Sequence, residues 1–266
     1  MDYRFDHFRR RQLYEDFQFG AGQQPGWSMP DFDLPTLNRG RVRKSDFMGS
    51  CPALFTFASL TDPIAASAAP VLKRLHREFC EGVAFVAVYV RESHPGDHVP
   101  QPETMEAKMR HARMLRERDG ISWTVAVDDL DGAFHRALGG NSGAAYLMDP
   151  NGNVAFRTPC SNDERVLRSV LLAITGGRKD HPFEQRRRVV PVARALAHLD
   201  DVVRAAGPRA VEDLRRETPL VYAAAEVAWF WRALTPVGRA AVVLAGMVTA
   251  ASIYGGVRFV RRRYAP

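Results

Sequence analysis

Cysteine is scarce in this chain of 266 residues. There are three, Cys51, Cys80 and Cys160, and none lies between the first two. An odd number at irregular spacing gives neither a disulfide framework nor the paired spacing of a zinc site. The first ten residues also lack an apolar core, so they do not read as a secretory signal. Together these features favour a reducing, cytoplasmic setting.

The stretch without cysteine has a clear pattern. Residues 53–58 are apolar and predict a buried strand, which runs through the turn Ser59–Asp62 into a helix starting at Pro63. The N-terminus of a helix stabilises a thiolate placed there. This turn has the right form for such a nucleophile but contains no thiol.

Asp62 followed by Pro63 is the combination that a helix start favours. The carboxylate accepts hydrogen bonds from backbone N–H groups of the first turn, and proline loses nothing at the first helical position. Such an N-cap is worth about 1 kcal/mol. The other interpretation of Asp62, a catalytic or binding carboxylate, stays open at this point.

Strands and helices alternate through the middle of the chain, which predicts an α/β fold with a mixed sheet flanked by helices. The Asn-Gly pair between the last two strands is a strong hairpin signal. The expected strands are 53–58, 83–90, 122–127, 143–148 and 154–156, and the expected helices are 63–79, 102–118, 130–138 and 161–176. Beyond them, apolar residues at helical spacing predict a helix over 189–203, and Gly207-Pro208 ends it and starts another.

Positive charge is concentrated in the C-terminal third. Residues 1–181 contain 23 Lys/Arg and 23 Asp/Glu, whereas residues 182–266 contain 14 and 7. Within the latter, residues 240–257 carry no charge and are bracketed by Arg239 and Arg258. Eighteen helical residues span about 27 Å, enough to cross a bilayer core. We therefore expect a transmembrane helix over 236–260 with membrane lipid as its partner, the alternative being a buried helix of a soluble domain.

The orientation of this segment follows from two rules that conflict. Without a signal peptide, the domain ahead of the helix is expected in the cytoplasm. The arginines at 258 and 261–263 favour a cytoplasmic C-terminus as well. A single span cannot satisfy both rules. Either the four arginines cross the membrane, or residues 219–257 form a hairpin or an interfacial pair of helices with both ends inside. Because Glu226 is costly at mid-membrane, we favour a single C-terminal span, with residues 221–234 at the interface.

Four stretches together resemble the iodothyronine deiodinases and their bacterial redoxin relatives, which share a thioredoxin fold. They are Phe57–Pro63, Val88–Pro95, Val127–Asp131 and Ala145–Phe156. The resemblance covers roughly residues 31–175. It implies a thioredoxin-like mixed sheet and an oxidoreductase of the deiodinase or redoxin type, and no cofactor is expected.

The resemblance also places the site. In the deiodinase register the family's selenocysteine or cysteine falls on Asp62. In a register similar to peroxiredoxins, Pro52 and Thr56 match and the reactive cysteine falls on Ser59. Both registers leave the turn without a thiol. The proline that precedes the hairpin in the family falls on Ser142.

Glu92 and His94 follow the strand 83–90, at the carboxyl edge where ligand sites of α/β folds gather. They match the family's Glu and His. This resemblance implies that one of the two side chains tunes the charge at the nucleophile and that the other transfers protons. With Thr61 of the turn they are candidate site residues; the alternative is a solvated polar loop. His94, Asp97 and His98 offer only three potential ligands, so we expect no metal.

Cys160 is the cysteine that we expect to be most reactive. It lies just before the last helix of the domain, and the N-terminus of a helix lowers the pKa of a nearby thiol. Cys51 lies at the opposite edge of the predicted sheet, and Cys80 is expected to pack as a small hydrophobic residue.

The predicted division is an N-terminal arm (1–30), a thioredoxin-like domain (31–176), a helical linker region (177–235), the transmembrane helix (236–260) and a basic tail (261–266). Two functions fit it: a membrane-tethered redoxin with altered or lost thiol catalysis, or a non-catalytic thioredoxin-fold binding module at the membrane. The partner is then a thiol-containing protein or a small-molecule substrate. We expect no nucleic acid, because the arginine runs at 9–11 and 186–188 lack interleaved stacking aromatics.

Overall fold

The computed structural model describes residues 3–17, 22–177 and 189–230, with a few more between 234 and 246. A five-stranded sheet forms its centre, in the order β5-β4-β3-β6-β7. The first three in this order are parallel, and β6 and β7 complete the sheet by antiparallel pairing. This is the predicted thioredoxin-like mixed sheet. Its strands are β3 (Ala53–Ala58), β4 (Ala84–Tyr89), β5 (Thr124–Val127), β6 (Ala145–Met148) and β7 (Val154–Thr158).

Both faces of the sheet are buried. One face packs against α2 (Pro63–Phe79), α3 (Met105–Asp119) and α5 (Glu164–Thr175). The other face carries an aromatic core that includes Phe55, Phe57 and Tyr146. The elements that cover this second face are the small β1 (Asp33–Pro35) and β2 (Arg41–Arg43) pair, the short 3-10 helix η1 (Lys44–Asp46) and α4 (Ala133–Ala137).

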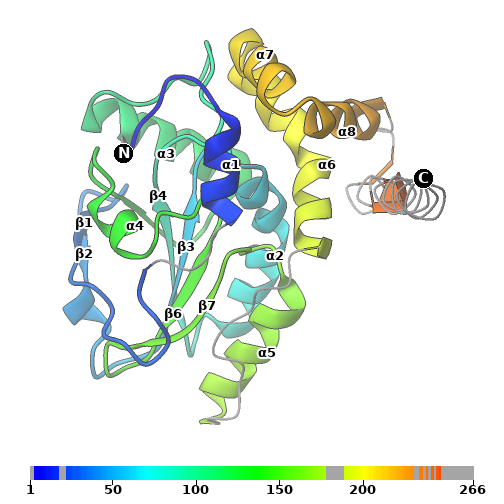
Figure 1. The fold of residues 1–266 in the computed structure, drawn as a ribbon. Coiled ribbons are helices and arrows are strands. Elements are labelled where there is room, and N and C mark those ends of the chain that lie inside the picture. Colours follow the sequence, from blue (N-terminus) through cyan, green and yellow to red (C-terminus); the bar gives the residue numbers. More distant parts are fainter. Residues whose placement is uncertain are drawn as a thin grey trace, which may run out of the picture.

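Four further helices come from the two ends of the chain. They are α1 (Arg10–Phe17), α6 (Val189–Ala206), α7 (Pro208–Glu217) and α8 (Pro219–Phe230). Helix α6 packs along α2, and α7 and α8 pack on α6 (Figure 1). Residues Phe8 and Leu13 of the N-terminal segment join the same apolar cluster as α6 and α7. Segments from opposite ends of the sequence therefore meet beside the N-terminal end of α2.

Several element boundaries have local causes. Helix α5 begins after Asp163, whose side chain accepts a hydrogen bond from the Val166 backbone, and α7 begins at Pro208 after Gly207, as expected. Helix α3 begins later than the predicted residue 102, because Thr104 caps it through a bond from the Ala107 backbone. The predicted helix 130–138 shortens to α4, which starts after Gly132 in the left-handed conformation.

The expectation that Cys80 packs as a small hydrophobic residue is wrong. Cys80 is exposed, because it caps the C-terminus of α2 one residue after Phe79, and it is Phe79 that fills the buried position.

The predicted membrane helix 236–260 and tail 261–266 lie almost entirely outside the described residues. Within the described ranges, no helix combines the length and the apolar character that crossing a bilayer requires. The anchor and the domain boundaries stay predictions.

Candidate functional site

The turn between β3 and α2 begins the site. Asp62 is only 2% exposed and caps α2, its Oδ1 accepting a hydrogen bond of 2.8 Å from the Ile64 backbone. The N-cap interpretation is thus confirmed. The loop before β6 comes very close to this turn at Gly143, which has φ +70°. A Cβ there would lie 2.5 Å from Cγ2 of Ile64, so only glycine allows the approach.

Glu92 is fully buried and bonded within the protein. It accepts hydrogen bonds from the Thr61 backbone N–H at 3.0 Å, from the Thr61 hydroxyl at 2.7 Å and from the Tyr89 hydroxyl. Nδ1 of His111 lies 3.2 Å from the same carboxylate. Burial raises the pKa of Tyr89 well above its ordinary value, so this hydroxyl stays protonated and donates. These hydrogen bonds hold the turn against the loop that follows β4.

His94 lies on the other side of this loop. Its backbone N–H donates to the Thr61 hydroxyl at 3.0 Å, which brings three predicted residues together: Thr61, Glu92 and His94. Its ring packs on Phe8, with centroids 4.4 Å apart. Burial lowers the pKa of His94 to about 4, so the imidazole is neutral at pH 7.

Two polar atoms, one in this ring and one in the preceding residue, have no hydrogen-bond partner among the described residues. They are Nδ1 of His94 and Oγ of Ser93, and each residue is 7% exposed. A buried polar atom left unpaired costs about 1–3 kcal/mol, so such atoms are rare in packed interiors. Both residues line a cavity, although the two unpaired atoms themselves have almost no accessible surface.

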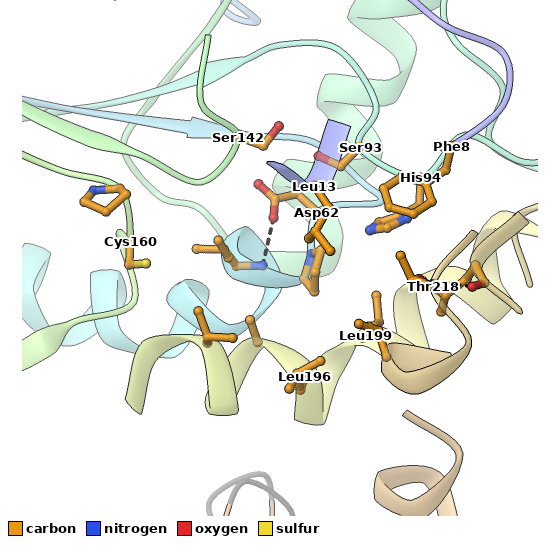
Figure 2. Close-up of a pocket in the computed structure, with 17 residues that line it drawn as sticks. Phe8, Leu13, Asp62, Ser93, His94, Ser142, Cys160, Leu196, Leu199 and Thr218 are labelled. Carbon is orange, nitrogen blue, oxygen red and sulfur yellow. Dashed lines mark hydrogen bonds between the residues drawn. The ribbon is translucent and has the colours of Figure 1, made fainter. Parts of the chain in front are cut away.

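The cavity has a volume of about 290 Å³ and adjoins the turn. Figure 2 shows Asp62 at its centre, with Leu196 and Leu199 of α6 facing it across the cavity. Most of its lining is apolar and comes from the four end helices and the start of α2. The polar lining consists of Asp62, Ser93, His94, Ser142, Cys160 and Thr218.

Cys160 also lines this cavity, on the side away from His94 (Figure 2). It is buried, and its backbone N–H donates to the Thr158 hydroxyl at 3.3 Å. Among the described residues that line the cavity, none is Lys or Arg. The cavity therefore offers this thiol no cationic side chain to stabilise its thiolate.

Ser59, the nucleophile position of the second register, is equally buried but is absent from the cavity lining. Its hydroxyl has no partner among the described residues. Asp62 therefore lines the cavity and Ser59 does not, and both registers stay predictions.

The cover over the turn is the part that sequence reasoning missed. Asp213 of α7 ties the N-terminal segment down: its Oδ2 accepts from the Phe8 backbone at 3.2 Å and lies 3.0 Å from Nδ1 of His7. Phe8 and Leu13 then close the cavity together with α6 and α8. The helical spacing of apolar residues in 189–203 predicted α6 itself, but that pattern does not say which surface its apolar side covers.

No metal site accompanies this arrangement in the part of the chain that the structure describes, where no group of three or more His, Cys, Asp or Glu could hold an ion. The cavity lining also contains no glycine-rich loop or basic side chain of the kind that holds a phosphate-bearing cofactor.

Comparisons with known proteins find similarity over part of the chain. No family model matches the chain. Thyroxine 5-deiodinase of Gallus gallus is 28% identical over 118 residues, and that of Sparus aurata is 27% identical over 121 residues; each match covers 41% of this chain and 45% of the relative. The chain therefore spans less than half the length of the curated relatives it matches.

Solved structures with a similar fold include two redox proteins. The thioredoxin domain of a thiol-disulfide oxidoreductase from Bacteroides vulgatus has a TM-score of 0.44 and 16% identity, over 56% of this chain and 99% of that one. A peroxidoxin from Mycobacterium tuberculosis has a TM-score of 0.42 and 17% identity, over 58% and 97%. The curated matches confirm the predicted resemblance, since this chain is similar to the deiodinases. The order and pairing of its strands give it a thioredoxin-like fold.

Proposed function

We propose that this protein binds a small apolar molecule in the cavity beside the turn that, by resemblance, corresponds to the reaction site of the deiodinases. The observation that carries the proposal is the cavity itself, which helices from both ends of the chain close over Asp62. Its volume of about 290 Å³ lies at the lower edge of the range for ligand pockets. An apolar wall with a few convergent polar groups is typical of such pockets.

The residues at the turn favour binding over thiol chemistry. Asp62, which matches the family's nucleophile in the deiodinase register, serves as the cap of α2. Two of the three thiols, Cys51 and Cys80, are not part of the cavity lining. The cavity lining supplies no cation to activate the third, Cys160.

A neutral fluorescent probe, N-phenyl-1-naphthylamine, tests the proposal on the full chain. We expect its fluorescence to rise on binding with saturable stoichiometry of one. The variant Leu196→Trp fills the cavity and should abolish the signal, whereas Leu172→Trp on the exposed face of α5 should not. Saturable binding that survives Leu196→Trp would place the probe elsewhere and refute the proposal.

Thiol catalysis through Cys160 is the second candidate, because this thiol lines the same cavity. Its test is turnover of peroxide, disulfide and iodinated phenol substrates with dithiothreitol or reduced thioredoxin. If Cys160 acts, Cys160→Ser loses turnover while its melting temperature stays unchanged. Equal turnover of both proteins removes this candidate.

We also propose that residues 236–260 tether the domain to a membrane. The charge-free run over 240–257 supports this, and so does the apolar character of α8, which leads into it and leaves Leu220 85% exposed. Labelling of Ala265→Cys in sealed spheroplasts tests the single-span topology. Labelling from the cytoplasmic side alone contradicts it.

A further inference from the structure

We infer that the cavity takes the hydrocarbon chain of a membrane lipid, which enters lengthwise beside α8. The inference rests on the proposed function, on the cavity as well as on the membrane tether. It specifies the class of the ligand and the side from which the ligand comes.

The cavity follows the length of a helix. One stripe of α6 lines it, formed by Val192, Ala195, Leu196 and Leu199. These positions recur at i, i+3, i+4 and i+7, so they share one side of the helix, and seven residues of helix rise about 10 Å. Figure 2 shows lining side chains distributed along α6 in this way. An unbranched chain matches an elongated cavity of this kind.

Different elements form the two ends of the cavity. At the start of α6, the loop that contains Cys160 lies against the helix, because the Asn162 side chain donates to the Pro191 carbonyl oxygen at 2.8 Å. At the other end, the lining includes Thr218 just before α8 and Val221 within it. Cys160 and Thr218 therefore mark opposite ends of the cavity (Figure 2).

The polar groups of the lining offer little to a ligand. Oδ1 of Asp62 caps α2, and the Thr218 hydroxyl donates to the Leu214 carbonyl oxygen at 3.0 Å. The unpaired atoms of Ser93 and His94 have almost no accessible surface. Among the described lining residues there is also no Lys or Arg. The enclosed part of the ligand is therefore hydrocarbon and its headgroup stays outside, because burying an unpaired polar group is unfavourable.

Helix α8 has apolar side chains toward the cavity and toward the outside. Val221 lines the cavity, whereas the adjacent Leu220 is 85% exposed. Ala223 and Val227 follow Leu220 at i+3 and i+7 and are exposed as well. These three residues form an uncharged stripe on one side of the helix. An exposed apolar surface therefore lies next to one end of the apolar cavity.

A lipid bilayer is the occupant that suits this stripe. The charge-free run over 240–257 begins soon after α8 ends at Phe230, and it is the segment that we propose enters the membrane. Helix α8 then lies at the bilayer surface with Leu220 and Val227 toward the lipid. A lipid chain beside Val221 enters the cavity without passing through water, which avoids the cost of hydrating its methylene groups.

Photochemical labelling of the full chain in lipid nanodiscs tests the inference. Two phosphatidylcholines are compared, one with a diazirine at the end of an acyl chain and one with a diazirine next to the ester. Mass spectrometry locates the labelled residues after irradiation. We expect the terminal diazirine to label Val192 and Cys160, and the diazirine next to the ester to label Val221. A third sample contains the terminal diazirine on a free fatty acid in nanodiscs of unlabelled lipid.

A blocking variant verifies the path of the chain. Leu196→Trp fills the middle of the cavity and should reduce labelling of Val192 by the terminal diazirine at least tenfold, while Val221 stays labelled by the other lipid. Leu172→Trp, on the exposed face of α5, is the matched control and should leave both patterns unchanged. Melting curves verify folding, and Ala195→Leu replaces the blocking variant if Leu196→Trp does not fold.

The outcomes separate this inference from the proposals on which it rests. Labelling of α8 without any labelling of α6 or Cys160 overturns the entry of the chain and leaves the tether intact. Deep labelling that Leu196→Trp does not reduce, or a reversed order of the two diazirines, also overturns it. Deep labelling by the free fatty acid alone overturns the lipid as the source. Failure of N-phenyl-1-naphthylamine to bind overturns the proposed function itself.

Discussion

Glu92 and His94 lie two residues apart on one loop, and both are buried, yet their surroundings differ. The Glu92 carboxylate is bonded to the turn, to Tyr89 and to His111. The His94 ring has an unpaired nitrogen and borders a cavity. In the family both positions are implied to support one reaction. Here the Glu92 carboxylate holds the turn and the loop together, whereas the His94 side chain borders the cavity without a hydrogen bond at Nδ1, so burial alone does not identify a functional residue.

The largest expected effect tests the structural role of Glu92. Glu92→Ala leaves the buried donors of Thr61 and Tyr89 without an acceptor, and we expect a loss of about 3–5 kcal/mol in the free energy of unfolding. His94→Ala removes no side-chain hydrogen bond and should cost about 2 kcal/mol or less. Urea denaturation measures both. Equal losses of unfolding free energy would show that Glu92 contributes no more to stability than His94 does.

A second prediction compares packed and hollow regions. Leu75 lies in the fully packed cluster between α2 and α5, whereas Leu199 borders the cavity. We expect Leu75→Ala to cost about 3–5 kcal/mol and Leu199→Ala about 2–3 kcal/mol, because the wall next to the cavity loses fewer contacts. Chemical denaturation of both variants gives the ranking. A larger cost for Leu199→Ala than for Leu75→Ala would contradict the presence of a cavity beside Leu199.

The free energy of unfolding should fall at acidic pH because of two buried histidines. Burial lowers the pKa of His94 to about 4 and of His135 to about 3, against about 6.5 in the unfolded chain. The unfolded chain therefore binds two more protons in this range. The stability that these groups contribute is complete above pH 6.5 and is lost as the pH falls toward 4.

Comparison with a variant isolates this effect. His135→Phe should reduce the slope of unfolding free energy between pH 6 and 4.5 by about 1.4 kcal/mol per pH unit, which corresponds to one proton. Thermal or urea unfolding at several pH values provides the slope. An unchanged slope would mean that His135 is protonated in the folded protein.

The smallest effect concerns Cys160. Its thiol is buried and the cavity lining provides no cation, so we expect Cys160→Ser to change stability by about 1 kcal/mol or less. Alkylation of the folded protein by iodoacetamide should be slower at Cys160 than at the exposed Cys80. Mass spectrometry of each labelled site decides this, and faster labelling of Cys160 would revive the catalytic candidate.

Sequence reasoning recovered the parts of the fold that local signals determine. The pair Asp62-Pro63 predicted the start of α2, and the Asn-Gly turn predicted the hairpin of β6 and β7. Because parallel strands end at one edge of the sheet, it also placed Glu92 and His94 near the turn, where the structure has them.

The cavity could not be predicted in this way. It depends on Phe8 and Leu13 at one end of the chain and on Leu196 and Leu199, more than 180 residues away. The sequence pattern predicted an arm for the first pair and a linker for the second. An amphipathic pattern shows that a helix buries one side, but the surface that receives this side is decided by tertiary packing. The unpaired atoms of Ser93 and His94 are visible only once that packing is known.

The contact of Asp213 with the N-terminal segment has a kinetic consequence. It joins α7 to residues 7 and 8, so that the cover of the cavity is held from both termini. Loss of this contact would free one wall of the cavity without unfolding the sheet, so the rate at which a molecule enters or leaves should depend on how often these segments separate. During synthesis the cover is completed last, when α6 to α8 have emerged, so the cavity takes its final form only at the end of folding.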